Sequence, residues 1–200
     1  MARPRLHDGR TRSALLDAAE RIVVEAGPHA LSVRTVADRV GVSTRAVYSV
    51  FGSKGGLLGG LAKRAFEFLR DALAELPITD DPAGDLIECG ATGYRRFVHE
   101  HPSLYRITFQ RVLPELELTD ELIAARAEGF GQLERRVQRL FDAGLLTRRD
   151  VRAAAVEFNA MCEGLANAEL RGGTLRVVPH GEEGQVWREA FDTLVRGLRD

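Results

Sequence analysis

The chain has 200 residues, which is enough for one large domain or for a small domain joined to a larger one. With 44% hydrophobic and 28% charged residues, its composition is that of a globular protein and excludes a disordered or fibrous one. No apolar run approaches the ~18 residues of a membrane span, and no apolar core follows the first arginines as in a signal peptide. Cys89 and Cys162 are isolated, so we expect a cytoplasmic protein with buried thiols and no metal or cofactor.

The net charge of −1 hides an uneven distribution. Residues 1–64 carry 11 Lys and Arg against 5 Asp and Glu, a net charge of +6. The other 136 residues carry 17 against 24, a net charge of −7, and the two parts sum to −1. This asymmetry favours an N-terminal part that meets a polyanion. The alternative is a chance cluster of charge on a solvated face.

Apolar residues recur at helical spacing along almost the whole chain. The first helix carries an apolar stripe through residues 15–26 and is stopped by Gly27 and Pro28. Further helices are expected at about 33–40, 44–50, 53–76, 81–99, a short one from 102, 119–143, 148–171 and 182–198, with a capping box at Thr147 and Asp150 before the eighth. The segment TLRVV is the only plausible strand and is too short to build a sheet. The sequence therefore predicts an all-α fold of about nine helices.

The second and third helices have the pattern of a helix-turn-helix. Ser32 and Ser43 are placed to cap the two helices, and Gly41 between them suits the left-handed conformation of a sharp turn. The small Ala37 allows the two helices to approach closely, and Val47 lies on the inner face of the third helix. In such a unit the second helix of the pair lies in the DNA major groove.

The outward face of the third helix offers hydrogen-bond donors and no acids. Thr44, Arg45, Tyr48 and Ser49 lie on this face, and residues 39–66 contain no Asp or Glu. Arginine can bond a guanine edge through two nitrogens, and hydroxyls reach base edges or phosphates. The free N–H groups of the helix start, capped by Ser43, suit a phosphate. For Tyr48 the alternative is a half-buried core aromatic.

The run SVRTVADRVGVSTRAVYSVFGSKGGLL resembles the DNA-binding region of TetR-family transcriptional regulators. The family has a Tyr-x-x-Phe pair that closes the recognition helix and a lysine that opens the next one, here Tyr48, Phe51 and Lys54. The resemblance implies that Tyr48 and Lys54 hold phosphates and that Thr44 and Arg45 read bases. It also implies that Phe51 locks the third helix onto the first and fourth.

The resemblance extends to the rest of the N-terminal part. Arg34 and Thr35 would contact the DNA backbone or a flanking base. The implied helix-turn-helix domain covers 1–52, with an arm at 1–10 that either reaches into a groove or forms a solvated tail. Gly55, Gly56, Gly59 and Gly60 depart from the family pattern. They predict either a soft start of the fourth helix or close packing against the first helix.

Residues 53–200 contain no catalytic motif, so we do not expect an enzyme. Large apolar residues converge from several helices and could line a pocket for a small, mostly apolar ligand, with plain core packing as the alternative. The candidates are Phe66, Leu69, Tyr94, Phe97, Tyr105, Phe109, Phe130, Leu133, Phe158, Met161 and Cys162. In the family this domain binds an inducer.

Residues 94–109 resemble one C-terminal subgroup that is named for a Trp-His-Gly signature. At the place of that signature this chain has Glu163 and Gly164 but no tryptophan. Glu163 could hold a cationic ligand group or pair with an arginine, and we favour pairing.

The helices at about 148–171 and 182–198 are apolar over a wide arc, which predicts cover on two sides. In the family these helices join two subunits. The sequence therefore predicts a homodimeric, ligand-responsive transcriptional regulator, most often a repressor, that binds a pseudo-palindromic operator in double-stranded DNA through helix 44–50 and is released by a small-molecule inducer. The alternative is a helical small-molecule-binding or scaffold protein whose basic N-terminal part contacts an acidic protein partner.

Overall fold

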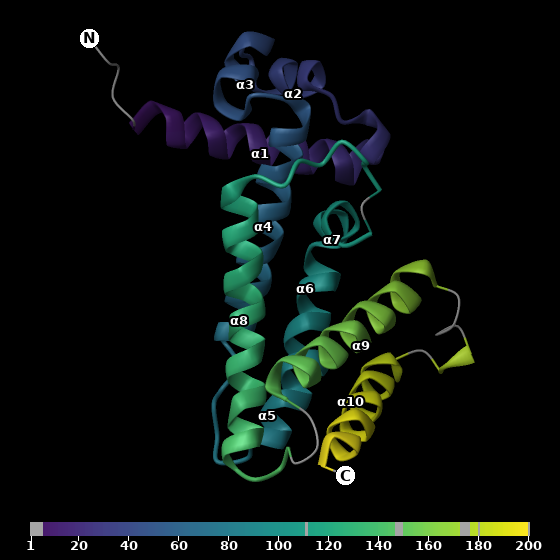
Figure 1. The fold of residues 1–200 in the computed structure, drawn as a ribbon. Helices are drawn as coiled ribbons and strands as arrows, with labels where there is room; N and C mark the ends of the chain where they lie inside the picture. The colour runs from purple at the N-terminus through teal and green to yellow at the C-terminus, as the bar shows by residue number, and fades with distance from the viewer. Residues whose placement is uncertain (1–5, 111, 147–149, 173–176, 180, 200) are drawn as a thin grey trace. The chain divides into compact units, whose positions relative to one another are not determined.

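The computed structural model describes residues 6–110, 112–146, 150–172, 177–179 and 181–199. Every regular element in these ranges is helical, so the predicted all-α class is confirmed (Figure 1). The elements are α1 Leu6–Ala26, a 3₁₀ turn at Pro28–Ala30, α2 Val33–Val40, α3 Thr44–Phe51, α4 Lys54–Ala74, α5 Pro82–Glu88, a π-helix at Cys89–Tyr94, α6 Arg95–Glu100, α7 Pro102–Thr108, α8 Asp120–Asp142, α9 Val151–Arg171 and α10 Glu183–Arg199. None of the helices in the described ranges has the length and apolar character that a membrane span requires.

The contacts divide the chain into two compact units. Unit 1 comprises Met1–Phe66 and Ser103–Ala125, and unit 2 comprises Glu67–Pro102 and Arg126–Asp200. Unit 1 therefore contains the predicted helix-turn-helix, the first part of α4, and α7 with the segment that follows it. The boundary predicted after residue 52 separates a DNA-binding domain from a ligand-binding domain, whereas the two units are defined by their internal contacts. The predicted boundary stays a prediction.

The core of unit 1 holds α1, α2 and α3 together. Leu15 of α1, Val36 of α2 and Val47 of α3 are all fully buried, and α2 contacts both α1 and α3 (Figure 1). In α4, Leu57, Leu58 and Leu61 are also fully buried. The apolar positions at helical spacing thus fix the orientation of the short helices, because burying each large aliphatic side chain contributes about 1.5–3 kcal/mol.

The predicted helix at 81–99 forms, but it is not a regular α-helix throughout. Asp81 caps its start by accepting hydrogen bonds from the N–H groups of Ala83 and Gly84, at 3.2 and 3.0 Å. Its middle, Cys89–Tyr94, is a π-helix that runs on into α6. A Cβ on Gly90 would lie 2.2 Å from the Phe191 ring, so glycine is needed there for α10 to pack against this segment.

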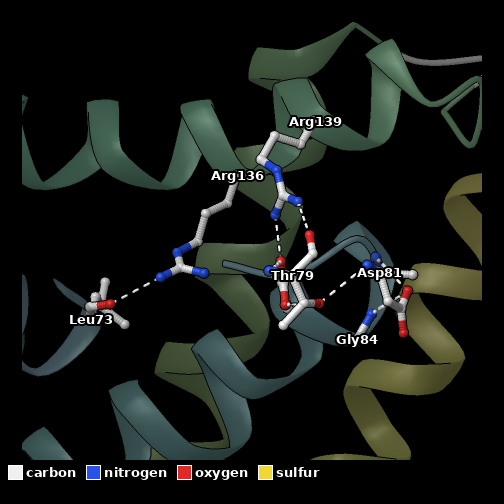
Figure 2. A network of polar contacts seen from close by, with 8 residues as sticks. Leu73, Thr79, Asp81, Gly84, Arg136 and Arg139 are labelled. Carbon is white, nitrogen blue, oxygen red and sulfur yellow. Dashed lines mark hydrogen bonds and ion pairs between the residues drawn. The ribbon is translucent and has the colours of Figure 1, made fainter. Parts of the chain in front are cut away.

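Two arginines of α8 bind the end of α4 and the turn before α5 (Figure 2). Arg136 is buried and donates to the Leu73 carbonyl at 2.9 Å, and Arg139 pairs with the buried carboxylate of Asp85. The same carboxylate accepts hydrogen bonds from the Thr79 N–H at 2.9 Å and from its hydroxyl at 2.8 Å. Burial alone would raise the pKa of Asp85, but these hydrogen bonds outweigh it and lower the pKa. Asp85 is therefore ionised and holds the turn in place.

Helices α9 and α10 pack against each other in unit 2 (Figure 1). Asp150 caps α9 through a 2.7 Å hydrogen bond from the Ala153 N–H, and Gly172 ends the helix with φ of 62°. The predicted capping box gave this role to Thr147, which lies outside the described residues, as do residues 174–176 of the possible strand. The described bounds of α9 and α10 lie within a few residues of the predicted ranges, 148–171 and 182–198.

Candidate nucleic-acid interface

The start of α2 is fixed by two reciprocal hydrogen bonds. The Thr35 N–H donates to the Ser32 Oγ at 3.1 Å, and the Ser32 N–H donates to the Thr35 Oγ1 at 3.0 Å. The Thr35 hydroxyl also lies 3.1 Å from the Ala30 carbonyl, to which it can donate. Because its hydrogen-bonding capacity is used locally, the Thr35 hydroxyl holds the helix start. Arg34 beside it is exposed, and its nearest acid is Asp38 at 3.9 Å on the same helix.

The turn between α2 and α3 has the expected geometry. Gly41 has φ of 75° and ψ of 32°, the left-handed conformation that glycine adopts without a steric cost. The Val42 N–H donates a hydrogen bond to the Ala37 carbonyl at 3.0 Å, which ends α2. The Ser43 hydroxyl then accepts a hydrogen bond from the Ala46 N–H at 3.2 Å and starts α3. Backbone bonds and caps thus set the angle between the helices.

The outward face of α3 is open. Thr44, Arg45, Tyr48 and Ser49 are all exposed, whereas Val47 on the opposite face is fully buried. The Tyr48 side chain is 51% exposed, which argues against the alternative of a core aromatic. Among the described residues none pairs with the Arg45 guanidinium, so its donors are available to a ligand.

Phe51, the last residue of α3, contacts α1 and α4. The Arg12 guanidinium of α1 lies over its ring, 4.9 Å from the centroid. A Cβ on Gly60 of α4 would lie 3.1 Å from the ring, so the glycine allows the ring to approach the helix axis closely. The ring therefore joins α3 to the two neighbouring helices, which is the position that the family resemblance implies for it.

The Lys54 ammonium, predicted to hold a phosphate, is already paired. Its Nζ lies 3.0 Å from the Glu115 carboxylate in the segment between α7 and α8. Arg12 is paired in the same way, with its Nη2 2.7 Å from Glu121. The sequence analysis missed both acids, because more than sixty residues separate Lys54 from Glu115 and no local pattern signals the contact.

The four glycines at the start of α4 are buried, and each makes a close contact. A Cβ would lie 2.5 Å from the Glu115 carbonyl at Gly55, 2.0 Å from the Phe51 carbonyl at Gly56 and 3.0 Å from the Glu117 carbonyl at Gly59. These contacts favour the close-packing interpretation over the soft one. They also correct its detail, since the neighbours come from α3 and from the segment after α7 as well as from α1.

The eleven candidate ligand residues fall into two groups. Phe66, Tyr105 and Phe109 belong to unit 1, where Phe109 lies 5.3 Å from Phe66 and 5.1 Å from Tyr105 between ring centroids. The others belong to unit 2, where Tyr94 and Phe97 lie 6.2 Å apart. The members in unit 2 are Leu69, Tyr94, Phe97, Phe130, Leu133, Phe158, Met161 and Cys162.

Six of the eight unit 2 candidates are buried in the core, whereas Phe130 and Met161 are only half-buried. Phe97, Phe158 and Cys162 are almost fully buried, and Phe158 stacks on Phe191 with centroids 4.6 Å apart. Burial raises the pKa of the Cys162 thiol, which keeps it neutral. A surface groove of about 560 Å³ is lined by other residues, among them Ile87 and Arg188. A ligand among the buried candidates would therefore require them to move apart.

Glu169, six residues after Glu163 on α9, pairs with an arginine, while the pairing of Glu163 itself stays a prediction. Glu163 accepts a hydrogen bond from Asn159 one helical turn earlier, at 2.8 Å. The Glu169 carboxylate accepts hydrogen bonds from Arg95 at 2.7 Å and from the Trp187 Nε1–H at 2.8 Å, and it lies 2.9 Å from His99 Nε2. Glu169 thereby joins α6, α9 and α10.

Comparisons with known proteins agree with this architecture. A model of the bacterial regulatory proteins of the tetR family matches residues 15–61, and a model of the tetracyclin repressor-like C-terminal domain matches residues 87–198, more than half of the chain. No curated protein sequence matches the chain. The Trp-His-Gly subgroup stays a prediction.

Solved structures are similar over nearly the whole chain. A protein of unknown function from Rhodococcus sp. RHA1 is 24% identical, with a TM-score of 0.77 over 94% of this chain and 95% of that one. The TetR-family transcriptional regulator PfmR from Thermus thermophilus is 25% identical, with a TM-score of 0.62 over 93% and 99%. RolR, solved in complex with resorcinol, is 17% identical, with a TM-score of 0.69 over 98% and 96%. The matched family consists of regulators and not of enzymes, and this chain belongs to it: it is a member of the TetR family of transcriptional regulators.

Proposed function

We propose that this TetR-family regulator acts as a homodimer that binds a pseudo-palindromic operator through α3 and releases it when a small molecule binds. The observation that carries the proposal is the exposed, acid-free face of α3, on which Arg45 has no partner among the described residues. A helix of this kind, held by two caps and a left-handed glycine, presents its donors in a fixed orientation, as major-groove recognition requires. We propose that it represses transcription and does not activate it, because repression is usual in the family.

Each exposed donor of α3 has a proposed role. Arg45 and Thr44 read base edges, with Arg45 bonding a guanine through two nitrogens. Tyr48 and Ser49 bond phosphates, and the N–H groups at the α3 start, capped by Ser43, receive another. Outside α3, Lys54 and Arg34 contact the DNA backbone. Thr35 fixes the α2 N-terminus, because its hydroxyl is engaged there.

Dimerisation is proposed through α9 and α10, at about 148–171 and 182–198. Val156 on α9 is 53% exposed, although large apolar residues of this kind are usually buried. Leu194 on α10 is only half-buried. A second subunit that covers these side chains would also supply the second copy of α3 that a pseudo-palindrome requires.

The effector is proposed to be a small, mostly apolar molecule that enters among the candidate residues of one of the two units. RolR, which shares the fold, was solved with resorcinol. To change operator occupancy from 99:1 to 1:99, the effector must favour the non-binding state by about 5.5 kcal/mol. Opening the buried aromatic cluster is a change of packing that such a difference in affinity could drive.

Selection of bound sequences from a random DNA pool tests the proposal. It predicts a pseudo-palindrome with half-sites one helical turn apart, or a multiple of this spacing, and an affinity that falls steeply with salt through counterion release. The alternative, an acidic protein partner for the basic N-terminal part, predicts no enriched DNA motif. A pool that stays random after repeated selection with folded protein would refute the operator-binding role.

A further inference from the structure

Two cations of unit 1 are paired with carboxylates of one acidic segment, residues 115–121. Lys54 Nζ lies 3.0 Å from Glu115 Oε1, and Arg12 Nη2 lies 2.7 Å from Glu121 Oε2. Both cations remain accessible, with 34% of each side chain exposed. Lys54 is the first residue of α4, and Arg12 lies over the ring of Phe51, the last residue of α3, so both cations lie close to the recognition helix.

The acidic segment is held against the start of α4 by contacts that do not depend on these ion pairs. The Glu117 N–H donates to the Gly55 carbonyl at 3.3 Å, and the Ser53 hydroxyl donates to the Glu117 carboxylate at 2.7 Å. Leu116 between the acids is buried. A Cβ at Gly55 would lie 2.5 Å from the Glu115 carbonyl, so only glycine allows the segment to lie this close. Glu115 is therefore positioned beside Lys54 by the fold.

Glu115 offers Lys54 what a DNA phosphate would offer. The hydrogen bond from Lys54 lowers the pKa of the Glu115 carboxyl, which is therefore ionised at neutral pH. An ammonium has three donors and could contact both groups, but the phosphate and the carboxylate would then be close like charges that repel each other. DNA binding must either displace Glu115 from Lys54 or accept this repulsion.

We infer that Glu115, with Glu121 in a supporting role, lowers the DNA affinity of this regulator by competing with DNA phosphates for Lys54 and Arg12. The inference rests on the proposed function. It states that the acidic segment weakens the contacts of Lys54 and Arg12 with the DNA backbone. Operator recognition then depends more on base contacts by Arg45, because part of the sequence-independent attraction is cancelled within the protein.

The test compares two substitutions that remove the same charge from the same segment. Glu115→Gln removes the partner of Lys54, whereas Glu117→Gln leaves the Lys54 pair intact and retains an oxygen that accepts the Ser53 hydroxyl. DNA affinity is measured by fluorescence anisotropy at fixed salt with a selected operator and with a random duplex. We expect Glu115→Gln to lower Kd roughly two- to five-fold per bound monomer, the range for releasing an exposed ion pair. Glu117→Gln should change Kd by much less.

A third variant shows whether the effect acts through Lys54. In a Lys54→Ala background, Glu115→Gln should have no more effect than Glu117→Gln. An equal gain from both Gln substitutions, or a gain from Glu115→Gln that persists without Lys54, would overturn the inference while leaving operator binding intact. If the wild type binds neither duplex, the proposed function fails and the inference with it.

A measurement on the wild type covers the case in which a variant does not fold. The Glu115 carboxyl pKa, followed by NMR, should rise when duplex DNA is added, because the carboxylate loses its cation and gains a nearby phosphate. A Glu115 pKa that is unchanged at saturating DNA would show that Lys54 keeps its internal partner, and the competition would be refuted.

Discussion

A methyl group on residue 56 has no room in this structure. The Cβ of an alanine there would lie 2.0 Å from the Phe51 carbonyl oxygen, at the junction of α3 and α4. A main-chain oxygen cannot swing away as a flexible side chain can, so α4 and the end of α3 must separate by about 1 Å to reach normal contact. We predict that Gly56→Ala destabilises the protein and disturbs the recognition helix.

The magnitude follows from two opposing terms. Alanine gains about 1 kcal/mol of helix propensity over glycine. Overpacking typically costs about 1–3 kcal/mol, and the rigid backbone contact places this site at the upper end. We therefore expect a net loss of roughly 1–2 kcal/mol in the free energy of unfolding. Urea denaturation at fixed protein concentration measures it, because mutual stabilisation by a dimer depends on concentration.

Gly131→Ala in α8 is the matched control. The nearest heavy atom to its Cβ, Nη1 of Arg135, lies at 3.6 Å, an ordinary contact. This substitution should gain about 1 kcal/mol and raise Tm by roughly 2–4 °C. If Gly56→Ala stabilised the protein as much as Gly131→Ala, the start of α4 would be soft, as the alternative interpretation of the glycines holds. Weak protection of amides 55–60 from hydrogen exchange would point the same way.

Three further substitutions probe caps and buried charges. Ser43→Ala should cost about 1 kcal/mol of stability and also weaken DNA binding, since it removes the α3 cap; equal DNA affinity would contradict this. Asp85→Asn should cost roughly 2–3 kcal/mol at pH 7, because Arg139 loses its carboxylate partner and keeps only the Thr79 carbonyl. The pKa of Asp85 is lowered in the folded protein, so its contribution to stability is present above the ordinary pKa of 3.8 and is lost as the pH falls through the folded pKa. Acidification through this range should therefore lower the stability of the wild type more than that of the variant. Glu169→Gln should cost about 2 kcal/mol of stability and shift the fluorescence emission of Trp187, the single tryptophan, which donates a hydrogen bond to Glu169. An unchanged spectrum and Tm would refute the role of Glu169 in joining α6, α9 and α10.

The helix-turn-helix could be predicted almost residue by residue. Ser32, Gly41 and Ser43 mark helix ends through local hydrogen bonds and a special backbone conformation, both of which depend on residues a few positions away. The α2 bounds agree with the prediction, and α3 extends one residue further, to Phe51. Because caps and turns depend on neighbouring residues, the helix boundaries that they set can be predicted from the sequence.

Contacts between distant segments could not be predicted. Gly90, inside the π-helix, lies against the ring of Phe191, about a hundred residues later. Glu115 meets Lys54 only because the segment after α7 returns to the start of α4. Aromatic residues of the C-terminal part are equally suited to a core and to a ligand pocket, because both require apolar side chains on inward helix faces. Their burial supports the core role and leaves the ligand role as a proposal.

The central claim is that the exposed face of α3 reads base sequence through Arg45, and a specificity profile tests it most directly. Profiles of wild type, Arg45→Ala and Arg34→Ala are recorded on a library of operator variants at one salt concentration. We predict that Arg45→Ala loses about 1–3 kcal/mol of discrimination at one base pair of each half-site, while Arg34→Ala weakens all sequences alike. A profile for Arg45→Ala that has the same base preferences as the wild type would contradict the account.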